Sequence, residues 1–480
     1  MSDNAISTIE VKARKLVRPE GGEASGSQEQ IINDDNEASG SATGSHGQLI
    51  EQSEMLSIVI DDKSKTSRSF QERLNSLKRE AQKSNLTPKI QKVPFILREN
   101  KDFEKYYEPR VVAVGPIHHG HPKFEYAENA KRRLAGAFIE ENGIDAESLY
   151  NKIMAELQDL KNSYVEDVIK SYSDDELAWM FLVDGSAILH FIYCVVHEIR
   201  KLEELQIKKD QVAFAQQDLF LLENQLPFQL LQLLMTFILD NKKKETINNS
   251  IRDFIHSNKM TTDRPMETLP KNAYHLLDLL RKQLLICTQT AKECQTPHSF
   301  RNVTELIASG IRLKPTGKCC LDISFGNSCF FIGTLKLPSL VVDDSTAPKF
   351  LNLIAYEMCP DFMNNFDVTS YVCFLDSLID HTEDVQELRK AHILINSLGS
   401  DKEVAKLFNK IGTDLVPNPD LYAEVQDAIE KHYNSKYISW MAQAYHSYFS
   451  SPWTFLALLG ALFALFLSSV QAYYSWRPRN

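Results

Sequence analysis

The feature that most constrains this chain is an uncharged stretch near its C-terminus, from Trp453 to Tyr474. At about 1.5 Å per residue, a helix of this length spans roughly 33 Å, which exceeds the ~30 Å hydrocarbon core of a bilayer. Leu459 and Leu465 lie inside it, and aromatic residues gather at both ends, as is typical of membrane interfaces. The stretch predicts one transmembrane helix over 453–474, in contact with the lipid bilayer, and a short tail over 475–480. A helix buried on every side in a soluble protein is the alternative.

Two opposing signals indicate on which side of the membrane the rest of the chain lies. The N-terminus lacks the apolar core of a secretory signal peptide, which favours a cytosolic head. Arg477 and Arg479 follow the span and only Lys436 closely precedes it, which favours the opposite orientation. Of the two signals, we give the missing signal peptide more weight. We expect a single-pass protein of the plasma membrane with its head in the cytosol.

Charge and cysteine usage narrow the classes of function. A net charge of -11 is unfavourable for a general nucleic-acid binder, and the short basic run at residues 242–244 is expected in a solvated loop. We therefore expect no nucleic-acid partner. The cysteines lack a dense regular spacing and mostly have apolar neighbours, which indicates buried thiols in a reducing compartment. They are Cys194, Cys287, Cys294, Cys319, Cys320, Cys329, Cys359 and Cys373.

Composition and periodicity divide the chain. Residues 1–88 are poor in apolar clusters and read as a disordered, acidic, Ser- and Gly-rich tail. Residues 91–450 form a globular head with mainly helical periodicity. Within it, residues 311–342 contain short β-rich runs separated by Gly and Pro, which predict a small antiparallel sheet or meander. The expected fold class is mainly α-helical (α+β), with this β insert and one C-terminal transmembrane helix.

Several helices can be placed from local patterns. Apolar residues recur from Ile144 to Ile169 at helical spacing, which predicts one long helix. The S-x-x-E spacings beginning at Ser173 and Ser400 are typical of capping boxes that start helices. We expect further helices within 219–239, 274–286 and 385–395, and a last one that begins at Pro419.

A series of motifs runs through the head in a fixed order. They include Val93-Pro94-Phe-Ile-Leu97-Arg98, Gly115-Pro116-Ile-His118-His119-Gly120, Asp184-Gly185, Glu223-Asn224-Gln225-Leu-Pro227-Phe228, Leu337-Pro338-Ser-Leu340, Phe350-Leu-Asn352 and Leu398-Gly399-Ser-Asp401. Over about residues 91–475, this order resembles the plant family catalogued as domain of unknown function 247. One departure is Ala127-Glu128, where the family usually has Met-Glu. The tail before about residue 90 lies outside the common pattern.

The resemblance implies a role in recognition. Most members of the family have no assigned activity, but some grass members are pollen-side determinants of self-incompatibility that pair with small secreted stigma proteins. A protein partner of this kind is therefore expected, and the oligomeric state is left open. No cofactor is expected.

The residues that could take part in catalysis or metal binding also have structural interpretations. Zinc at His118, His119 and His121 is the alternative to a packed turn, and we expect no metal because adjacent side chains diverge. Glu223, Asn224 and Gln225 are expected to satisfy helix ends, with Pro227 opening the next helix, and a catalytic acid is the alternative. A redox pair at Cys319 and Cys320 is disfavoured because a vicinal disulfide strains the backbone.

Two classes of function remain. The first is a membrane-anchored recognition or interaction protein without catalytic activity, in agreement with the absence of short catalytic signatures from the sequence. The second is a membrane-bound enzyme of an unrecognised class that acts through His118, His119 or Glu223.

Overall fold

The computed structural model describes residues 87–262, 266–270, 272–286, 301–317, 319–329, 332–363, 365–434 and 452–476. All of them belong to one compact unit, Thr66–Asn480. Nearly all of the expected tail at 1–88 and the end of the expected head at 435–450 lie outside the described residues.

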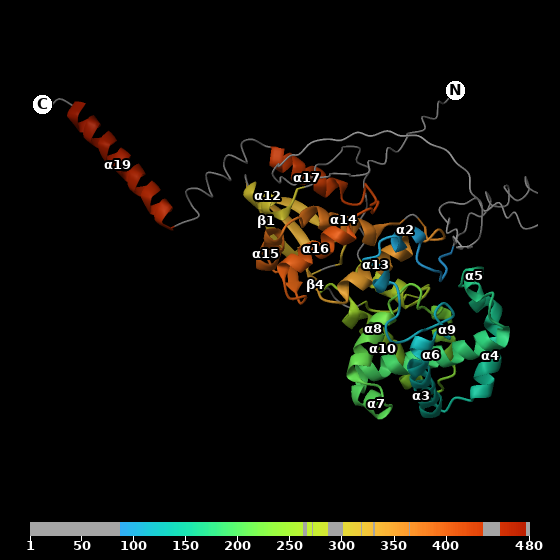
Figure 1. Cartoon of the computed structure of the whole chain (residues 1–480). Helices are drawn as coiled ribbons and strands as arrows, with labels where there is room; N and C mark the ends of the chain where they lie inside the picture. The colour runs from blue at the N-terminus through green and yellow to red at the C-terminus, as the bar shows by residue number, and fades with distance from the viewer. Residues whose placement is uncertain are drawn as a thin grey trace, which may run out of the picture. The chain divides into compact units, whose positions relative to one another are not determined.

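The described chain is mainly helical, as predicted (Figure 1). Its α-helices are α2 (Phe95–Arg98), α3 (Glu125–Asn142), α4 (Ala146–Lys161), α5 (Glu166–Ile169), α6 (Asp174–His197), α7 (Ile199–Glu204), α8 (Lys209–Asp218), α9 (Phe228–Thr236), α10 (Asn241–Asn258), α11 (Leu276–Leu284), α12 (Val303–Ala308), α13 (Thr346–Glu357), α14 (Asp367–Leu378), α15 (Thr382–Lys390), α16 (Asp401–Ile411), α17 (Ala423–Asn434) and α19 (Pro452–Trp476).

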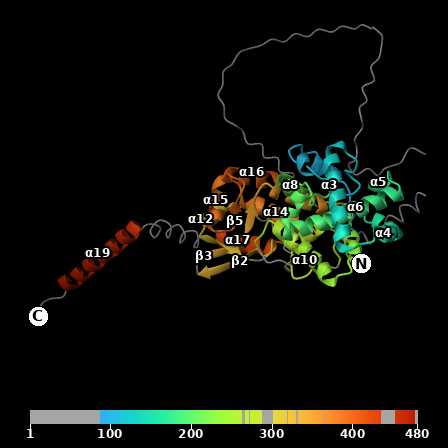
Figure 2. The same cartoon turned by 90° about the horizontal axis from the view of Figure 1, so that it is seen from below.

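Helix α6 lies at the centre of the N-terminal part of the head, in contact with α3, α4, α9 and α10 (Figures 1 and 2). Ser173 and Glu176 form the predicted capping box at its start. The helix continues through Asp184 and Gly185 without a break. A Cβ atom on Gly185 would lie 2.5 Å from Leu234 Cδ1, so glycine permits α9 to pack closely here.

Two helices bear on the membrane prediction. Among the described residues, α6 has the length and composition of a membrane span, but 78% of its most apolar window is buried inside the protein. It is therefore the core helix of the head. The expected span is helical as α19, which has 25 residues, and Leu459–Tyr473 is its apolar run among the side chains that the structure describes. Leu459 and Leu465 are 46% and 65% exposed, and the side chains of Trp453 and Tyr474 lie outside the described structure.

The β-rich insert differs from the predicted antiparallel sheet. Strands β1 (Ile311–Thr316), β2 (Ser324–Cys329) and β3 (Ile332–Pro338) form a sheet of order β1-β3-β2. Only β2 and β3 are antiparallel, because β1 pairs in parallel with β3. Strand β4 (Leu340–Val342) leaves this sheet after Pro338 and pairs in parallel with β5 (Leu394–Asn396). The prediction of a wholly antiparallel insert within 311–342 is therefore wrong.

Several helix boundaries also differ from the predictions. The helix predicted over 144–169 is divided into α4 and α5, and only residues 228–236 of the run 219–239 are helical after α8. The run 385–395 ends in strand β5, and the last helix of the head starts at Ala423 instead of Pro419. Residues 242–244 lie in the first turn of α10 and not in a loop. At these places tertiary packing ends or extends a helix that local periodicity alone does not delimit.

The cysteines only partly follow the prediction of reduced thiols. Cys194, Cys320, Cys359 and Cys373 carry thiols that are not in a disulfide. Burial is the main cause of the raised pKa of Cys194, about 12. Cys319 is disulfide-bonded, so the prediction is wrong for this residue. Because Cys320 is not disulfide-bonded, the bond is not a vicinal one between these two neighbours.

Candidate functional site

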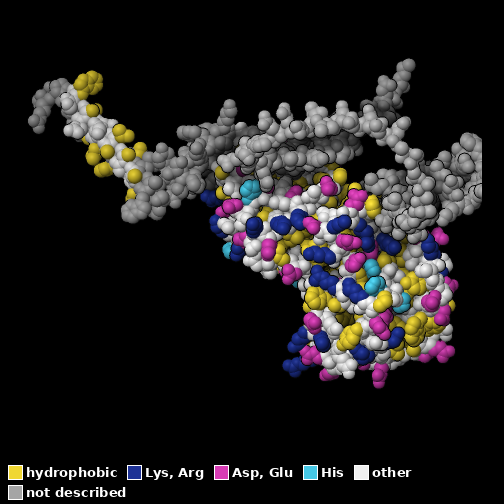
Figure 3. Space-filling view, viewed as in Figure 1, with side chains coloured by type: hydrophobic (Ala, Val, Ile, Leu, Met, Phe, Trp, Pro, Cys, Tyr) yellow, Lys and Arg dark blue, Asp and Glu magenta, His cyan; other side chains and the backbone are white. Residues whose placement is uncertain are grey.

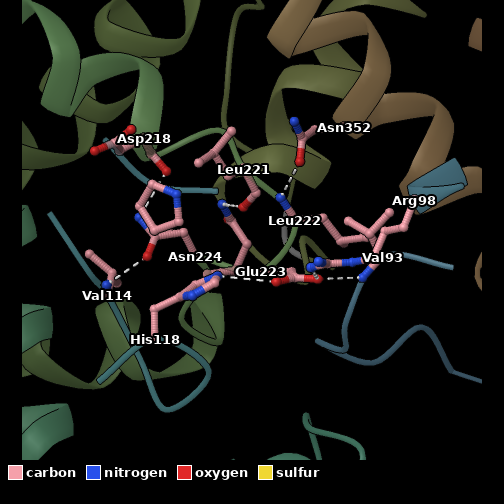
Figure 4. Close-up of polar contacts among 12 residues, drawn as sticks. Val93, Arg98, Val114, His118, Asp218, Leu221, Leu222, Glu223, Asn224 and Asn352 are labelled. Atoms are coloured by element: carbon pink, nitrogen blue, oxygen red, sulfur yellow. Dashed lines mark hydrogen bonds and ion pairs between the residues drawn. The ribbon is translucent and has the colours of Figure 1, made fainter. Parts of the chain in front are cut away.

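Glu223 contacts the N-terminal segment of the head just before α2 and at the end of α2 (Figure 4). Its Oε1 atom accepts a hydrogen bond from the Val93 backbone N–H at 2.7 Å and contacts the Arg98 guanidinium. His118 Nε2 lies 3.1 Å from Oε2, an ion-pair distance when the ring is protonated, although the nitrogen is not placed for a hydrogen bond. Burial alone would raise the pKa of Glu223, but the neighbouring His118, Arg98 and Val93 N–H hold it below its usual value.

Asn224 and Gln225 follow Glu223 and use their side-chain amides on backbone groups. Asn224 Oδ1 accepts from Val114 N at 2.7 Å, and its Nδ2 donates to the carbonyl oxygen of Val112 at 3.0 Å. Gln225 Nε2 donates to two carbonyls of its own loop, and its Oε1 accepts from Leu277 N at 3.1 Å, at the start of α11. The loop between α8 and α9 is therefore hydrogen-bonded both to residues 112–114 and to the start of α11.

Asp218, the last residue of α8, binds the next part of the same N-terminal segment. Its carboxylate accepts three backbone N–H groups, those of Arg110 at 2.9 Å, Val111 at 2.8 Å and Val112 at 3.0 Å. Burial raises the pKa of Asp218 above its usual value even though these bonds stabilise the charged form. Sequence reasoning did not select Asp218 as a site residue.

Asp184, in the middle of α6, also binds the N-terminal segment. Its Oδ2 accepts from Gly115 N at 2.9 Å, and its Oδ1 lies 2.6 Å from Lys131 Nζ. Lys131 also donates to the Ala113 carbonyl and pairs with Glu128. Gly115 has φ +69°, and a Cβ there would lie 2.8 Å from the Gln225 carbonyl oxygen, so both the backbone angle and the space require glycine.

We call Asp184, Asp218, Glu223 and Asn224 the polar clamp. They come from α6, the end of α8 and the loop before α9, and all four accept backbone N–H groups of the segment 93–115. The N–H groups that they bind, at 93, 110–112, 114 and 115, lie outside α2 and outside the strands, so buried side-chain acceptors take the place of a backbone partner. The clamp thus attaches the N-terminal segment to the helical core.

The other predicted motif residues shape turns around the clamp. Pro94 precedes α2, Pro227 precedes α9 as its N-cap residue, and the Pro116 carbonyl accepts from the Tyr172 hydroxyl at 2.8 Å. His119 is exposed, with its ring edge toward Tyr172. Gly120 has φ +77° in the same turn. The structure therefore brings His118, but not His119, to Glu223.

The chemistry open to this arrangement is limited by the groups that already occupy it. The best-formed cavities of the described head are lined by residues other than Glu223 and His118. Among the residues that the structure describes, no three His, Cys, Asp or Glu side chains are placed to hold a metal ion. The carboxylate oxygens of Glu223 already contact Val93 N, Arg98 and His118.

A second buried ion pair was missed by sequence reasoning. Arg281 of α11 lies 2.8 Å from Glu357 of α13, and Glu357 also accepts from the backbone N–H groups of Val368 and Thr369. Glu357 thus joins α11, α13 and α14 through buried polar contacts, as the polar clamp joins the segment 93–115 to the helical core. The available signal was a charged residue beside apolar neighbours in each helical run, Arg281 after Leu279-Leu280 and Glu357 after Leu353-Ile-Ala-Tyr356.

Comparison with known proteins places these residues in a family. A family model described as a plant protein of unknown function, DUF247, matches residues 90–467. The UPF0481 protein At3g47200 of Arabidopsis thaliana is 29% identical over 405 residues, which cover 77% of this chain and 82% of that protein. The putative UPF0481 protein At3g02645 of the same plant is 26% identical over 174 residues, or 36% of this chain and 32% of that protein.

No significant match to a solved structure was found. The family match includes the polar clamp, the β-rich insert and most of α19. The chain belongs to the plant DUF247 family of proteins of unknown function.

Proposed function

We propose that this protein is a single-pass membrane protein whose head recognises another protein and has no catalytic activity. The observation that carries the proposal is the exposed, uncharged helix α19 on a head whose buried motif side chains bind backbone groups.

Helix α19 supports the membrane part of the proposal. It presents hydrophobic side chains and no charged ones (Figure 3). Phe463, Leu465 and Phe466 are each more than three-fifths exposed. Such a helix is unfavourable in water and favourable in lipid, since apolar surface of this extent marks a binding or membrane site. We propose the plasma membrane as its location.

The polar clamp supports the recognition part. Motif residues that serve attachment leave the exposed surface free to vary without loss of the fold. On the face shown in Figure 3, acidic and basic side chains are interspersed over the head, as on a protein-binding surface or an ordinary solvated one. By resemblance to grass members of the family, we propose a pollen-side self-incompatibility determinant with a small secreted stigma protein as partner.

Exchange of the head between plants of different compatibility tests this function. The expected result is that pollen rejection follows the head, whereas exchange of α19 alone changes nothing. Pollen whose compatibility is indifferent to both exchanges would exclude the self-incompatibility role.

The His118 and Glu223 pair favours the second candidate, a membrane-bound enzyme. His118 is partly exposed, and its Nε2 lies beside a buried carboxylate, as a general base requires. Glu223→Gln and His118→Gln, measured in the full-length protein, separate the candidates. If the protein is a recognition module, both substitutions lower only the folded fraction, and binding per folded molecule is unchanged. A turnover that either substitution abolishes at an unchanged folded fraction would establish the enzyme.

A further inference from the structure

An apolar cavity of about 70 Å³ lies between α3, α6, α8 and the segment 111–114. Alanine side chains from three helices face it: Ala127 and Ala130 of α3, Ala187 of α6 and Ala215 of α8. Leucine or methionine is the common filling at such positions in a helical core, so the hollow results from short side chains at the contact of three helices.

The neighbouring ion pairs hold this cavity open. Lys131 of α3 and Asp184 of α6 lie 2.6 Å apart beside it and fix the spacing of the two helices. Asp218 binds the backbone N–H groups of Arg110 and Val111, which fixes the segment over the hollow. The helices therefore cannot approach one another to close the space without breaking buried polar contacts.

The walls offer no site for ordered water. Lys131 lines the cavity, but its ammonium group already contacts Asp184, Glu128 and the Ala113 carbonyl. Apart from Gln211 at the mouth, the remaining wall is aliphatic and aromatic. An apolar hollow without free polar groups hydrates poorly and gains free energy when an apolar group enters it.

The mouth of the cavity carries a polar group that can orient a ligand. Tyr126, which is 51% exposed, and Gln211 lie at the solvent side. Gln211 Oε1 accepts from Lys208 N at 3.1 Å at the start of α8. In the described part of the chain, no acceptor is bonded to Gln211 Nε2, so this amide can donate to a ligand.

We propose that this cavity is a binding site for a small aliphatic molecule with one hydrogen-bond acceptor, such as a ketone. The carbon chain fills the hollow among the alanines, and the ligand oxygen accepts a hydrogen bond from Gln211 Nε2 at the mouth. This site is separate from the recognition function proposed above and stands or falls independently of it.

Methyl ketones of four to eight carbons are the probes. The full-length protein, in detergent and labelled with ¹³C at alanine methyl groups, is titrated with each ketone and followed by NMR. We expect saturable shifts at Ala127, Ala130, Ala187 and Ala215, with affinity rising about fourfold per methylene until the hollow is full. The buried Ala135 and Ala178, which do not line the cavity, report non-specific partitioning and should not shift.

Three substitutions test the geometry. Ala130→Leu fills the hollow and should abolish the saturable shifts at Ala187 without lowering the melting temperature, whereas Asn129→Leu, on an exposed position of the same helix, should bind as the wild type does. Ala215→Leu on α8 serves if the first variant does not fold. Gln211→Glu keeps the acceptor for Lys208 N but removes the donor, so it should lose the preference for a ketone over an alkane of equal length.

Two outcomes would overturn the proposal. One is a wild-type titration that shifts all alanine methyl groups without saturation, which indicates partitioning into detergent or the protein surface. The other is unchanged ketone affinity in both filled variants, which places the ligand elsewhere.

Discussion

Buried carboxylates in this head lie where backbone N–H groups need a hydrogen-bond acceptor. Asp184 and Asp218 accept backbone N–H groups of residues 110–115, which lie in no helix or strand. The energetic consequence is asymmetric, because removal of one partner leaves the other buried without compensation. The clamp is therefore sensitive to single substitutions.

The Lys131 and Asp184 pair gives the sharpest test of this sensitivity. Their side chains are only 4% and 1% exposed. Lys131→Met should lower the free energy of unfolding by about 3–5 kcal/mol, because Asp184 is left buried without its cation. Urea unfolding of the full-length protein in detergent measures the loss. Lys170→Met breaks the exposed pair with Asp167 and should barely change stability, and equal effects of the two would contradict the role of the clamp.

His275 predicts a loss of stability in acid. It is buried at the N-cap of α11, where Nδ1 accepts from Asp278 N at 3.1 Å, and burial lowers its pKa to about 4. The folded pKa lies below the unfolded value of about 6.5, so the stabilisation is complete above pH 6.5 and is lost as the pH falls toward 4. From pH 7.5 to 4.5 this group should cost about 2.5 kcal/mol.

His275→Asn is the matched variant, because asparagine can cap the helix but does not titrate. The difference between the two unfolding free energies should narrow as the pH falls from 7.5 to 4.5. A difference that does not change with pH would show that His275 is not the group responsible.

At the level of elements, the boundaries depend on what each helix packs against. Helix α6 has a local start signal in Ser173 and Glu176, and the structure confirms it. Asp and Gly have low helix propensity, yet the ion pair of Asp184 with Lys131 and the close contact of Gly185 with α9 stabilise both residues inside the helix. Contacts between helices thus decide features that local propensity leaves open.

Helix α19 carries the prediction at this scale. Leu459→Arg with Leu465→Arg should prevent membrane insertion, because two arginines near the centre of a span cost roughly 5–7 kcal/mol on insertion scales. Fractionation of expressing cells with alkaline carbonate extraction measures the change. Leu459→Ala with Leu465→Ala is the control and should remain in the membrane, and an arginine variant that still resists extraction would contradict the anchor.

At the scale of the whole molecule, the disulfide at Cys319 is informative about the cellular compartment in which the head lies. Disulfides persist mainly in oxidising compartments, whereas the sequence favoured a cytosolic head. We expect Cys319 in protein from its native membrane to resist alkylation until it is reduced, as detected by mass spectrometry. Cys373, a partly buried free thiol, is the internal control.

Protease protection in sealed microsomes completes this test. A bonded Cys319 together with a protected head would place the head in the lumen and overturn the cytosolic assignment. Alkylation of Cys319 without reduction, with a head that external protease digests, would support the cytosolic assignment and contradict the disulfide.

The sequence by itself determined the features that depend on neighbouring residues. An uncharged run is visible without any partner, and a capping box involves residues three positions apart. The helical class and the position of the β-rich insert follow from periodicity over short windows, and the order of motifs was enough to identify the family.

Only the tertiary structure decided which distant segments meet. The parallel pairing of β4 with β5, the ion pair of Arg281 with Glu357 and the binding of segment 93–115 by the clamp each join residues far apart in the chain. The free energy of these contacts comes from burial, which places a carboxylate beside whichever unsatisfied N–H the fold brings to it. Local sequence records that Glu223 is polar among apolar neighbours, but not that Val93 is its partner.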